Sequence, residues 1–464
     1  MKLGDICSKI GSGATPRGGK DSYKDSGTAI IRSQNVLDWS FSSSGLAFID
    51  DDQSKALSNV EVKQGDVLLN ITGDSVARAC MVPSEFLPAR VNQHVAIIRA
   101  NEEANNLFLL AWLQANKGTL LKLASSGATR NALTKRMLEN LDVNLPSIDV
   151  QNKVAAFIDS IQAKITLNAR LNGYLLDLAT AQFEAALKER ASNVRLGDIV
   201  GLEDSKRVPL NSRDRESRKG PYPYYGATSI MDYVDDYLFD GVRVLLGEDG
   251  SVIDSEGKPV LQYVWGRYWV NNHAHILKAA GAYPLEAIYV ALRRTSIGHI
   301  VTGAVQMKIS QRNLKKLEVS MPDPGSLDYL QPLFAAYRNL CEESRHLVTL
   351  RDTLLPKLMT GEIAVSELNL KQLNSHLAET LRPFGCHIPA IQKTGQLALL
   401  RTAPYPRPSR CSNNQHRSPT SQIAHPADRG VWASPLGRNP RRRLQPGAVA
   451  RRLHGARSGT GTAI

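Results

Sequence analysis

The chain contains a weak internal repeat, and this feature limits the possible fold more than any other. Three sequence signatures occur twice, in the same order. The first signature is LGDI, at residues 3–6 and again at 196–199. The second is QGDVLLNITGDS from Gln64 followed by NQHVAII from Asn92, which correspond to DGVRVLLGEDGS from Asp240 and NNHAHIL from Asn271. The third is SGATRNALTKRMLENLDVNLP from Ser126, which corresponds to TGAVQMKISQRNLKKLEVSMP from Thr302. Three matches in register indicate a duplicated module.

Each copy has the pattern of a strand-rich globule. Short apolar runs such as VLLNI, VAIIR and LQYVWG are separated by clusters of Gly, Asn, Asp and Pro, which is typical of strands joined by turns. A helical segment at 107–121 has a counterpart at 285–294. We therefore expect an α+β protein with two mixed α/β modules, module 1 over residues 1–148 and module 2 over residues 191–325.

A different pattern follows each module. From residue 150 to about 187 the apolar residues recur at spacings of three and four, and from about Tyr329 leucines recur every seven residues. This periodicity is helical, and roughly 38 residues at about 1.5 Å each make a rod of about 57 Å. We predict two long helices, over 149–190 and 326–368, that pair as an antiparallel coiled coil; the alternative is that each packs on its own module. Pro356 should end or kink the second helix.

The net charge of +13 lies in the C-terminal part of the chain. Residues 371–464 hold 15 of the 57 basic residues, 2 of the 44 acidic residues and 10 of the 23 prolines. Residues 1–370 are therefore neutral overall, so bulk charge gives no argument for nucleic-acid binding by the body of the protein. The tail, residues 369–464, lacks apolar periodicity and should be disordered. It is either a frame-shifted or read-through reading frame or a basic DNA-binding arm.

Cysteine usage and hydropathy favour a cytoplasmic protein. The five cysteines show no Cys-x-x-Cys or Cys/His spacing, so we expect reduced thiols and no zinc site. No window reaches 18 uninterrupted apolar residues, and the N-terminus leads directly into the first signature. We expect neither a membrane span nor a secretion signal.

Several of these segments resemble one protein family. LRDTLLPKLMTGEI, residues 350–363, is similar to the C-terminal signature of type I restriction-modification specificity subunits. The same holds for LGDI followed by GSGATPRGG and TAIIRSQNV, and for GDVLLNITGDS followed by NQHVAII. The order of module, long helix, module, long helix is also that of the family. The resemblance covers residues 1 to about 368.

The resemblance implies a non-catalytic protein that reads DNA. In this family the two modules are target recognition domains, each reading one half of a split, asymmetric sequence in double-stranded DNA. The helices separate the modules and dock two modification subunits, which methylate adenine, and restriction subunits join that core. The chain itself should hold no cofactor and no metal, because S-adenosylmethionine, ATP and Mg²⁺ belong to the partner subunits.

The sequence lacks the motifs for the chemistry of those partners. It has no Asn/Asp-Pro-Pro-aromatic motif of an amino-methyltransferase, and the glycine-rich run at 11–20 lacks the first glycine and the final Ser or Thr of a P-loop. Two alternatives stay open: a fused or stand-alone enzyme that cuts or methylates DNA, and a half-system component that binds only protein.

A neutral module must read DNA with polar side chains in the grooves and a few basic residues on phosphates. The candidates in module 1 lie on loops or precede its last leucine-rich segment: Ser12, Thr15, Arg17, Lys20, Arg32, Ser33, Gln34, Asn35, Arg130, Asn131, Thr134 and Lys135. Those in module 2 are Lys206, Arg207, Tyr222, Tyr225, Gln306, Lys308 and Gln311.

Other polar residues have two interpretations. The triplets at 92–94 and 271–273, and Thr72, either contact DNA or tie strand ends together. Glu248 and Asp249 oppose phosphate, although an acidic side chain can accept a hydrogen bond from the amino group of cytosine. The candidates for docking the modification subunits are apolar helix residues: Phe157, Ile161, Leu171, Leu175, Leu333, Leu340, Leu347 and Leu354.

Overall fold

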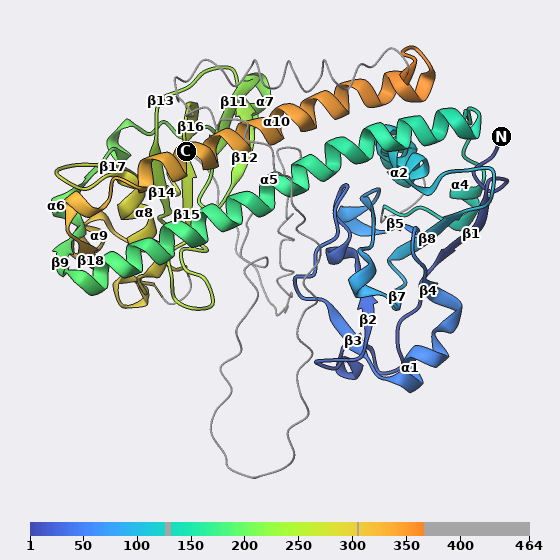
Figure 1. Cartoon of the computed structure of the whole chain (residues 1–464), viewed down its shortest axis with the longest axis horizontal. Helices are drawn as coiled ribbons and strands as arrows, with labels where there is room; N and C mark the ends of the chain where they lie inside the picture. The colour runs from blue at the N-terminus through green and yellow to red at the C-terminus, as the bar shows by residue number, and fades with distance from the viewer. Residues whose placement is uncertain (126–130, 304–305, 366–464) are drawn as a thin grey trace, which may run out of the picture.

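Two modules lie side by side along a pair of long helices (Figure 1). The computed structural model describes residues 1–125, 131–303 and 306–365. Arg130 and the tail at 369–464, both subjects of predictions above, lie outside these described residues. Both modules contain runs of strands together with separate helices, which confirms the predicted α+β class.

Module 1 contains two four-stranded sheets. One is antiparallel, in the order β1 (Cys7–Ser12), β8 (Val95–Ala100), β5 (Val67–Asn70), β6 (Ala79–Met81). The other has the order β3 (Ala47–Ile49), β2 (Thr28–Ile31), β7 (Ala89–Val91), β4 (Glu61–Val62), with β2 and β7 parallel. The α-helices among the described residues of the module are α1 (Asp51–Ala56), α2 (Asn106–Ala115), α3 (Lys117–Ser125) and α4 (Lys135–Glu139).

Module 2 repeats both sheets strand for strand, as the duplicated signatures predict. The antiparallel sheet has the order β10 (Val200–Leu202), β17 (Ala274–Ala279), β14 (Arg243–Gly247), β15 (Leu261–Val264). The second has the order β12 (Ile230–Val234), β11 (Lys219–Tyr225), β16 (Arg267–Val270), β13 (Phe239–Asp240), and again the central pair is parallel. A two-stranded sheet of β9 (Ala191–Arg195) and β18 (Glu318–Pro322) is added. The module's helices are α6 (Leu196–Ile199), α7 (Ser212–Ser217), α8 (Leu285–Arg294) and α9 (Gln311–Lys316).

The long helices are α5 (Ile148–Glu189) and α10 (Leu330–Thr360), and they run antiparallel (Figure 1). Helix α5 leads from module 1 to module 2, and α10 returns. Pro356 does not end α10, which continues to Thr360 and is capped by Gly361 in the left-handed conformation. No helix in the described part of the chain has the length and apolarity needed to cross a membrane.

Both long helices complete the cores of both modules. In α5, Phe157 and Ile161 are buried in the core of module 1, while Phe183 is buried in that of module 2. In α10, Phe334 belongs to the core of module 2, and Leu347 belongs to that of module 1. The modules are therefore fixed to the helix pair by apolar burial at both of its ends.

This packing corrects three members of the predicted docking set. Phe157, Ile161 and Leu347 are at most 3% exposed, so no partner can reach them. Leu333 and Leu354 pack against the cores of modules 2 and 1 and are only partly exposed. Leu175 and Leu340 are half-buried, and Leu171 alone of the set is exposed. A helix that packs on its own module has the same apolar spacing as a helix that packs on a partner subunit. The spacing therefore could not distinguish core residues from docking residues.

Polar side chains occupy the middle of the helix pair. Asn168 is fully buried and donates to Glu343 Oε2 at 2.8 Å, and Lys164 pairs with the same carboxylate at 3.1 Å. Asn172, also buried, donates to Cys341 Sγ at 3.3 Å. Burial raises the pKa of the Cys341 thiol to about 12, so the thiol stays protonated. Because a slip of one helix along the other would leave these groups unpaired, they fix the register of the pair.

Candidate nucleic-acid interface

Each module has a polar edge, which we call its tip. The two tips share the same pattern of backbone hydrogen bonds. Tip 1 comprises residues 71–73, 93–94 and 131–133, and tip 2 comprises residues 248–250, 272–273 and 307–309. In tip 1, Ile71 N donates to His94 O at 3.0 Å, Gly73 N to Asn131 O at 3.1 Å and Leu133 N to Ile71 O at 2.8 Å. The matching bonds in tip 2 are Glu248 N to His273 O at 2.8 Å, Gly250 N to Met307 O at 3.0 Å and Ile309 N to Glu248 O at 2.9 Å.

The asparagines that begin the two triplets have structural roles. Asn92 and Asn271 are 7% and 3% exposed, and their Oδ1 atoms accept from the backbone N–H of His94 and His273 at 3.1 and 2.8 Å. Of the two interpretations left open above, strand-end tying therefore applies to the asparagines. The histidines themselves are partly exposed and point their Nδ1 atoms at equivalent positions, Thr72 in module 1 (2.7 Å) and Asp249 in module 2 (2.6 Å).

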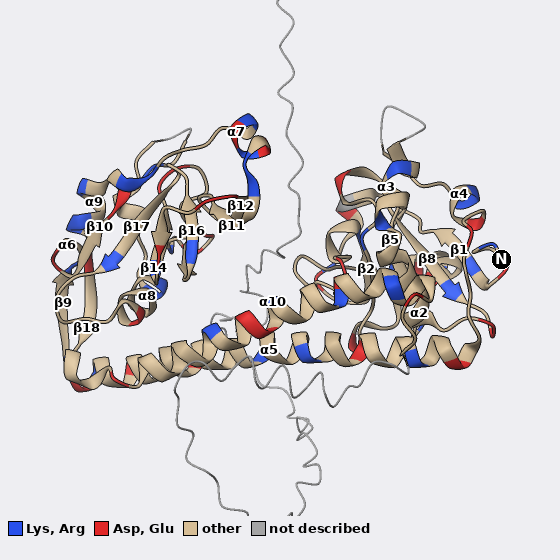
Figure 2. Cartoon of the chain, turned by 90° about the horizontal axis from the view of Figure 1, so that it is seen from above, with Lys and Arg blue, Asp and Glu red and all other residues tan. Residues whose placement is uncertain are grey.

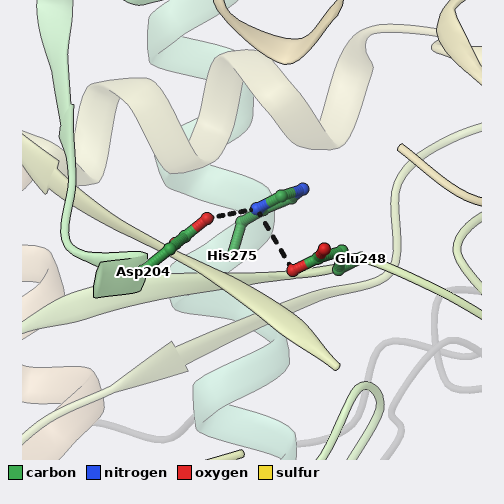
Figure 3. A group of neighbouring side chains, drawn as sticks. All are labelled: Asp204, Glu248 and His275. Carbon is green, nitrogen blue, oxygen red and sulfur yellow. Dashed lines mark hydrogen bonds and ion pairs between the residues drawn. The ribbon is translucent and has the colours of Figure 1, made fainter. Parts of the chain in front are cut away.

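Beneath tip 2 lies a network of charged groups (Figure 3). His275 is fully buried; its Nδ1 lies 2.6 Å from Asp204 Oδ2 and 3.7 Å from Glu248 Oε2, and its Nε2 lies 2.8 Å from the Ile309 carbonyl. A carbonyl and a carboxylate only accept hydrogen bonds, so the geometry requires His275 to donate from both nitrogens. Arg207 Nη1 lies 2.6 Å from Glu248 Oε2, and Gln311 donates to Asp204 Oδ2 at 2.6 Å.

Asp204, Glu248 and His275 have the residue types of a metal site, with candidate ligand atoms within 4.8 Å of one another. Their hydrogen bonds do not fit such a site, however. A metal could bind His275 Nδ1 only if that nitrogen carried no proton. In the structure His275 Nδ1 lies 2.6 Å from Asp204 Oδ2, so the two side chains hydrogen-bond directly to each other. Arg207 and Lys308 already provide cations for Glu248. The group is therefore best described as an ion-pair network that ties tip 2 to the sheet.

The protonation of Asp204 links this network to pH. Burial alone would raise the pKa of Asp204, but the hydrogen bonds from His275 and from the Ile276 amide outweigh it, and the pKa lies below its ordinary value. A lowered carboxyl pKa stabilises the folded state above the unfolded pKa of about 3.9, and this stabilisation is lost as the pH falls through the folded value.

We therefore expect Asp204→Asn to lower the free energy of unfolding of module 2 at neutral pH by about 1–3 kcal/mol, because the hydrogen-bond donors of His275, Ile276 and Gln311 lose a charged acceptor. The deficit should shrink as the pH falls below the ordinary carboxyl pKa and through the lowered value of the folded state, because the wild-type carboxyl then also becomes protonated. Urea unfolding across this pH range measures the effect. Asp328→Asn, at an exposed aspartate, is the matched control and should change little. A deficit that stays constant with pH would show that the charge of Asp204 is not its cause.

Most of the predicted DNA-binding residues lie at the surface, and in the view of Figure 2 the basic residues of α4 and α9 lie on the side of the modules away from the helix pair. The exposed ones are Ser12, Thr15, Arg17, Gln34, Asn131, Thr134 and Lys135 in module 1 and Lys206, Gln306, Lys308 and Gln311 in module 2. Arg32, Ser33 and Tyr222 are half-exposed. The side chain of Lys20 is outside the described part of the structure.

Two predicted contacts are wrong because the side chains are buried in the protein interior. Asn35 is fully buried and donates to the carbonyls of Ser42 and Ser44 at 2.9 and 3.2 Å. Tyr225 is 6% exposed and packs edge-on against Tyr268. Arg207 is partly exposed, with 13% of its side chain accessible, and also belongs to the network under tip 2, so its contact with DNA stays a prediction.

Sequence reasoning left Thr72, His94, Asp249 and His273 undecided, although the repeat already aligned the two histidines. Thr72 follows β5 and His94 precedes β8, so they meet only because β5 and β8 pair antiparallel. Asp249 and His273 meet in the same way through the pairing of β14 with β17. The pairing of strands brings the side chains together, and it was not available from the signatures alone.

The fold and the tips define a class of protein, one with two copies of a mixed α/β module mounted on one antiparallel helix pair. Residues 1–175 and 189–331 match the family described as type I restriction modification DNA specificity domain. Because the match includes both modules and most of the chain, the protein belongs to this family.

Two curated relatives are named as type I restriction enzyme specificity subunits, one of them as putative. Over 127 residues the chain is 30% identical to the putative type I restriction enzyme specificity subunit S.HindORF215P of Haemophilus influenzae, covering 27% of this chain and 32% of that protein. Over 288 residues it is 24% identical to the type I restriction enzyme MjaIX specificity subunit of Methanocaldococcus jannaschii, covering 53% of this chain and 66% of that protein. The matches thus span about one third and just under two thirds of the two relatives.

Solved structures of similar proteins include a type I restriction-modification S subunit from M. genitalium and the HsdS subunit from Thermoanaerobacter tengcongensis. The first has 15% identity and a TM-score of 0.47, covering 77% of this chain and 95% of that one. The second has 16% identity and a TM-score of 0.32, covering 78% of this chain and 96% of that one.

Proposed function

We propose that the chain is the sequence-reading subunit of a type I restriction-modification complex. Module 1, residues 1–148, and module 2, residues 191–325, each read one half of a split site in double-stranded DNA. The helices at 149–190 and 326–368 hold them apart and dock two modification subunits, which restriction subunits join. The observation that carries the proposal is the duplicated module on an antiparallel helix pair in a member of this family.

The antiparallel arrangement bears on the shape of the target. Each module is followed by one long helix, and the two helices run in opposite directions. Two copies attached in this way face a duplex in opposed orientations, as dimeric DNA-binding proteins do with two half-sites. Because the side chains at the two tips differ, the half-sites should differ in sequence, which makes the whole target asymmetric.

One surface of α5 fits a partner helix. Leu167, Leu171, Tyr174 and Leu178 are exposed by 49%, 37%, 68% and 45%, and their spacings of four, three and four place them on one face of the helix. We call this set the α5 stripe. A row of large apolar residues at these spacings is typical of a seam that packs against another helix. We propose that a helix of a modification subunit covers the α5 stripe.

Catalysis and cofactor binding belong to the partners in this proposal. The chain supplies no methyltransferase or P-loop motif, and the charged network under tip 2 is saturated by its own hydrogen bonds and ion pairs. S-adenosylmethionine, ATP and Mg²⁺ would bind the modification and restriction subunits.

Methylation mapping tests the proposal. The chain is co-expressed with cognate modification subunits, and the methylated adenines of the host genome are sequenced. We expect one motif made of two different short half-sites around an unread spacer, and no methylation when this chain is omitted. A single continuous motif, or methyl transfer by the isolated chain, would contradict the proposal.

A further inference from the structure

We propose that equivalent positions 72 and 249 select one base pair in each half-site, and that Asp249 selects a base with an amino group in the major groove, cytosine or adenine. This inference rests on the proposed function and names a specificity-determining residue for it.

The first argument is that both positions occupy the same scaffold. The three backbone hydrogen bonds of tip 1 recur in tip 2, and an isolated bridge joins Thr72 to Ala132 as another joins Asp249 to Lys308. On this common backbone the side chain changes from a hydroxyl to a carboxylate. A position that varies on a fixed scaffold can change what is read without changing how the module docks.

The second argument is that a histidine fixes the side chain at each position. His273 Nδ1 lies 2.6 Å from Asp249 Oδ1, and because a carboxylate only accepts, His273 donates. His94 Nδ1 lies 2.7 Å from Thr72 Oγ1 in the same way. In module 1, Gln93 Nε2 lies 3.0 Å from His94 Nε2, and Thr15 donates to Gln93 Oε1. The reading groups are thus preorganised, which reduces the entropy lost on binding.

The third argument is that Asp249 retains an open acceptor. Among the described residues His273 contacts its Oδ1 and no hydrogen bond or ion pair reaches its Oδ2, and its side chain is 20% exposed. Glu248, its neighbour, is 15% exposed and already contacts Arg207, His275 and Lys308. Asp249 is therefore the acidic group of tip 2 that has an oxygen left for a ligand.

The fourth argument is access. Gly250 follows Asp249 with φ +81°, as Gly73 follows Thr72 with φ +74°, and a Cβ on either glycine would meet nothing within 4 Å. The backbone next to Thr72 and Asp249 is therefore exposed to solvent and not covered by other atoms. Lys308, the bridge partner of Asp249, has a side chain that is 55% exposed and offsets the charge of Asp249 near phosphates.

The chemistry of a carboxylate then limits the base. Cytosine N4 and adenine N6 are the amino donors in the major groove, whereas guanine O6 and N7 and thymine O4 are acceptors that repel a carboxylate. A threonine hydroxyl both donates and accepts, so Thr72 should discriminate less strongly at the equivalent position of the other half-site.

The test uses the complete complex with its modification subunits, acting on duplexes with randomised half-sites that are sequenced after methylation. Asp249→Ala should reduce the preference at one position of the module 2 half-site by about tenfold and leave the module 1 half-site unchanged. Asp249→Asn should shift that position toward adenine, the base that an asparagine amide contacts through two hydrogen bonds. Thr72→Asn should alter only the module 1 half-site, and Asp328→Asn should alter neither.

If both Asp249 variants keep the wild-type preference at every position, or lose methylation evenly without relaxing any position, the proposal is overturned. A wild-type complex that yields no split motif refutes the proposed function instead. The two failures are therefore distinguishable within one experiment.

Discussion

Replacing Leu171 and Leu178 with aspartate should abolish co-purification of the chain with the modification subunits. Both residues belong to the α5 stripe, where they are exposed by 37% and 45% in the free chain. A carboxylate buried under a partner helix without a cation would be strongly unfavourable. At about 2 kcal/mol or more for each central interface residue, the pair should weaken association by about a thousandfold.

The control for this prediction lies two residues from the stripe. Ala169 is exposed on α5 but lies about 200° around the helix from Leu167, off the α5 stripe. Ala169→Asp should leave co-purification intact. Since the substituted side chains are exposed in the free chain, circular dichroism and thermal unfolding should be unchanged in all variants. Undiminished assembly of the Leu171, Leu178 double variant would exclude the stripe as the docking surface.

The fold could be predicted from sequence because the repeat and the helical period are local signals. LGDI, the Asn-x-His triplets and the final leucine-rich segments recur in order, and the sheets of the two modules have the same strand order. The three- and four-residue period after Val150 corresponds to the 42-residue helix α5. Such patterns depend on neighbours in the chain, so they are visible without coordinates.

The partner of each helix face could not be predicted in the same way. Leu347 and Leu171 both sit on long apolar periods, yet Leu347 is 2% exposed in the core of module 1 and Leu171 is 37% exposed. What separates them is the return of α10 across the first module, a contact between residues far apart in sequence. The same limit explains Asn35, which reads as an exposed turn residue but lies buried under the carbonyls of Ser42 and Ser44.

The proposed base-reading positions, Thr72 and Asp249, could be predicted only in part from the sequence. The repeat aligned His94 with His273, and the general chemistry of acidic groups allowed Asp249 a role with cytosine. The hydrogen bond that holds Asp249 depends on the pairing of β14 with β17, and so does the position of His275 beneath it. A motif search could not find Thr72, because a threonine in a loop has no distinctive spacing.

The length of the helix pair should set the length of the unread spacer. Between the two cores, around Asn172 on α5 and Cys341 on α10, the two long helices face each other directly. Seven residues inserted after Asn172 and seven after Leu340 add two helical turns, about 10 Å, and keep each seam on the same face. Neither insertion touches a tip, so neither half-site should change.

We expect the preferred spacer of this variant to lengthen by about three base pairs, since successive base pairs rise about 3.4 Å. Three base pairs also turn the duplex by about 100°, given about 10.5 base pairs per turn, whereas the helix pair gains almost whole turns. The lengthened site should therefore be methylated more slowly than the wild-type site of the parent. The same insertion in α5 alone serves as control, because it puts Asn168 and Asn172 out of register with Glu343 and Cys341 and should disrupt assembly. Methylome sequencing gives the motif of each variant, and a changed half-site with an unchanged spacer would refute the proposal that the helix pair sets the spacer length.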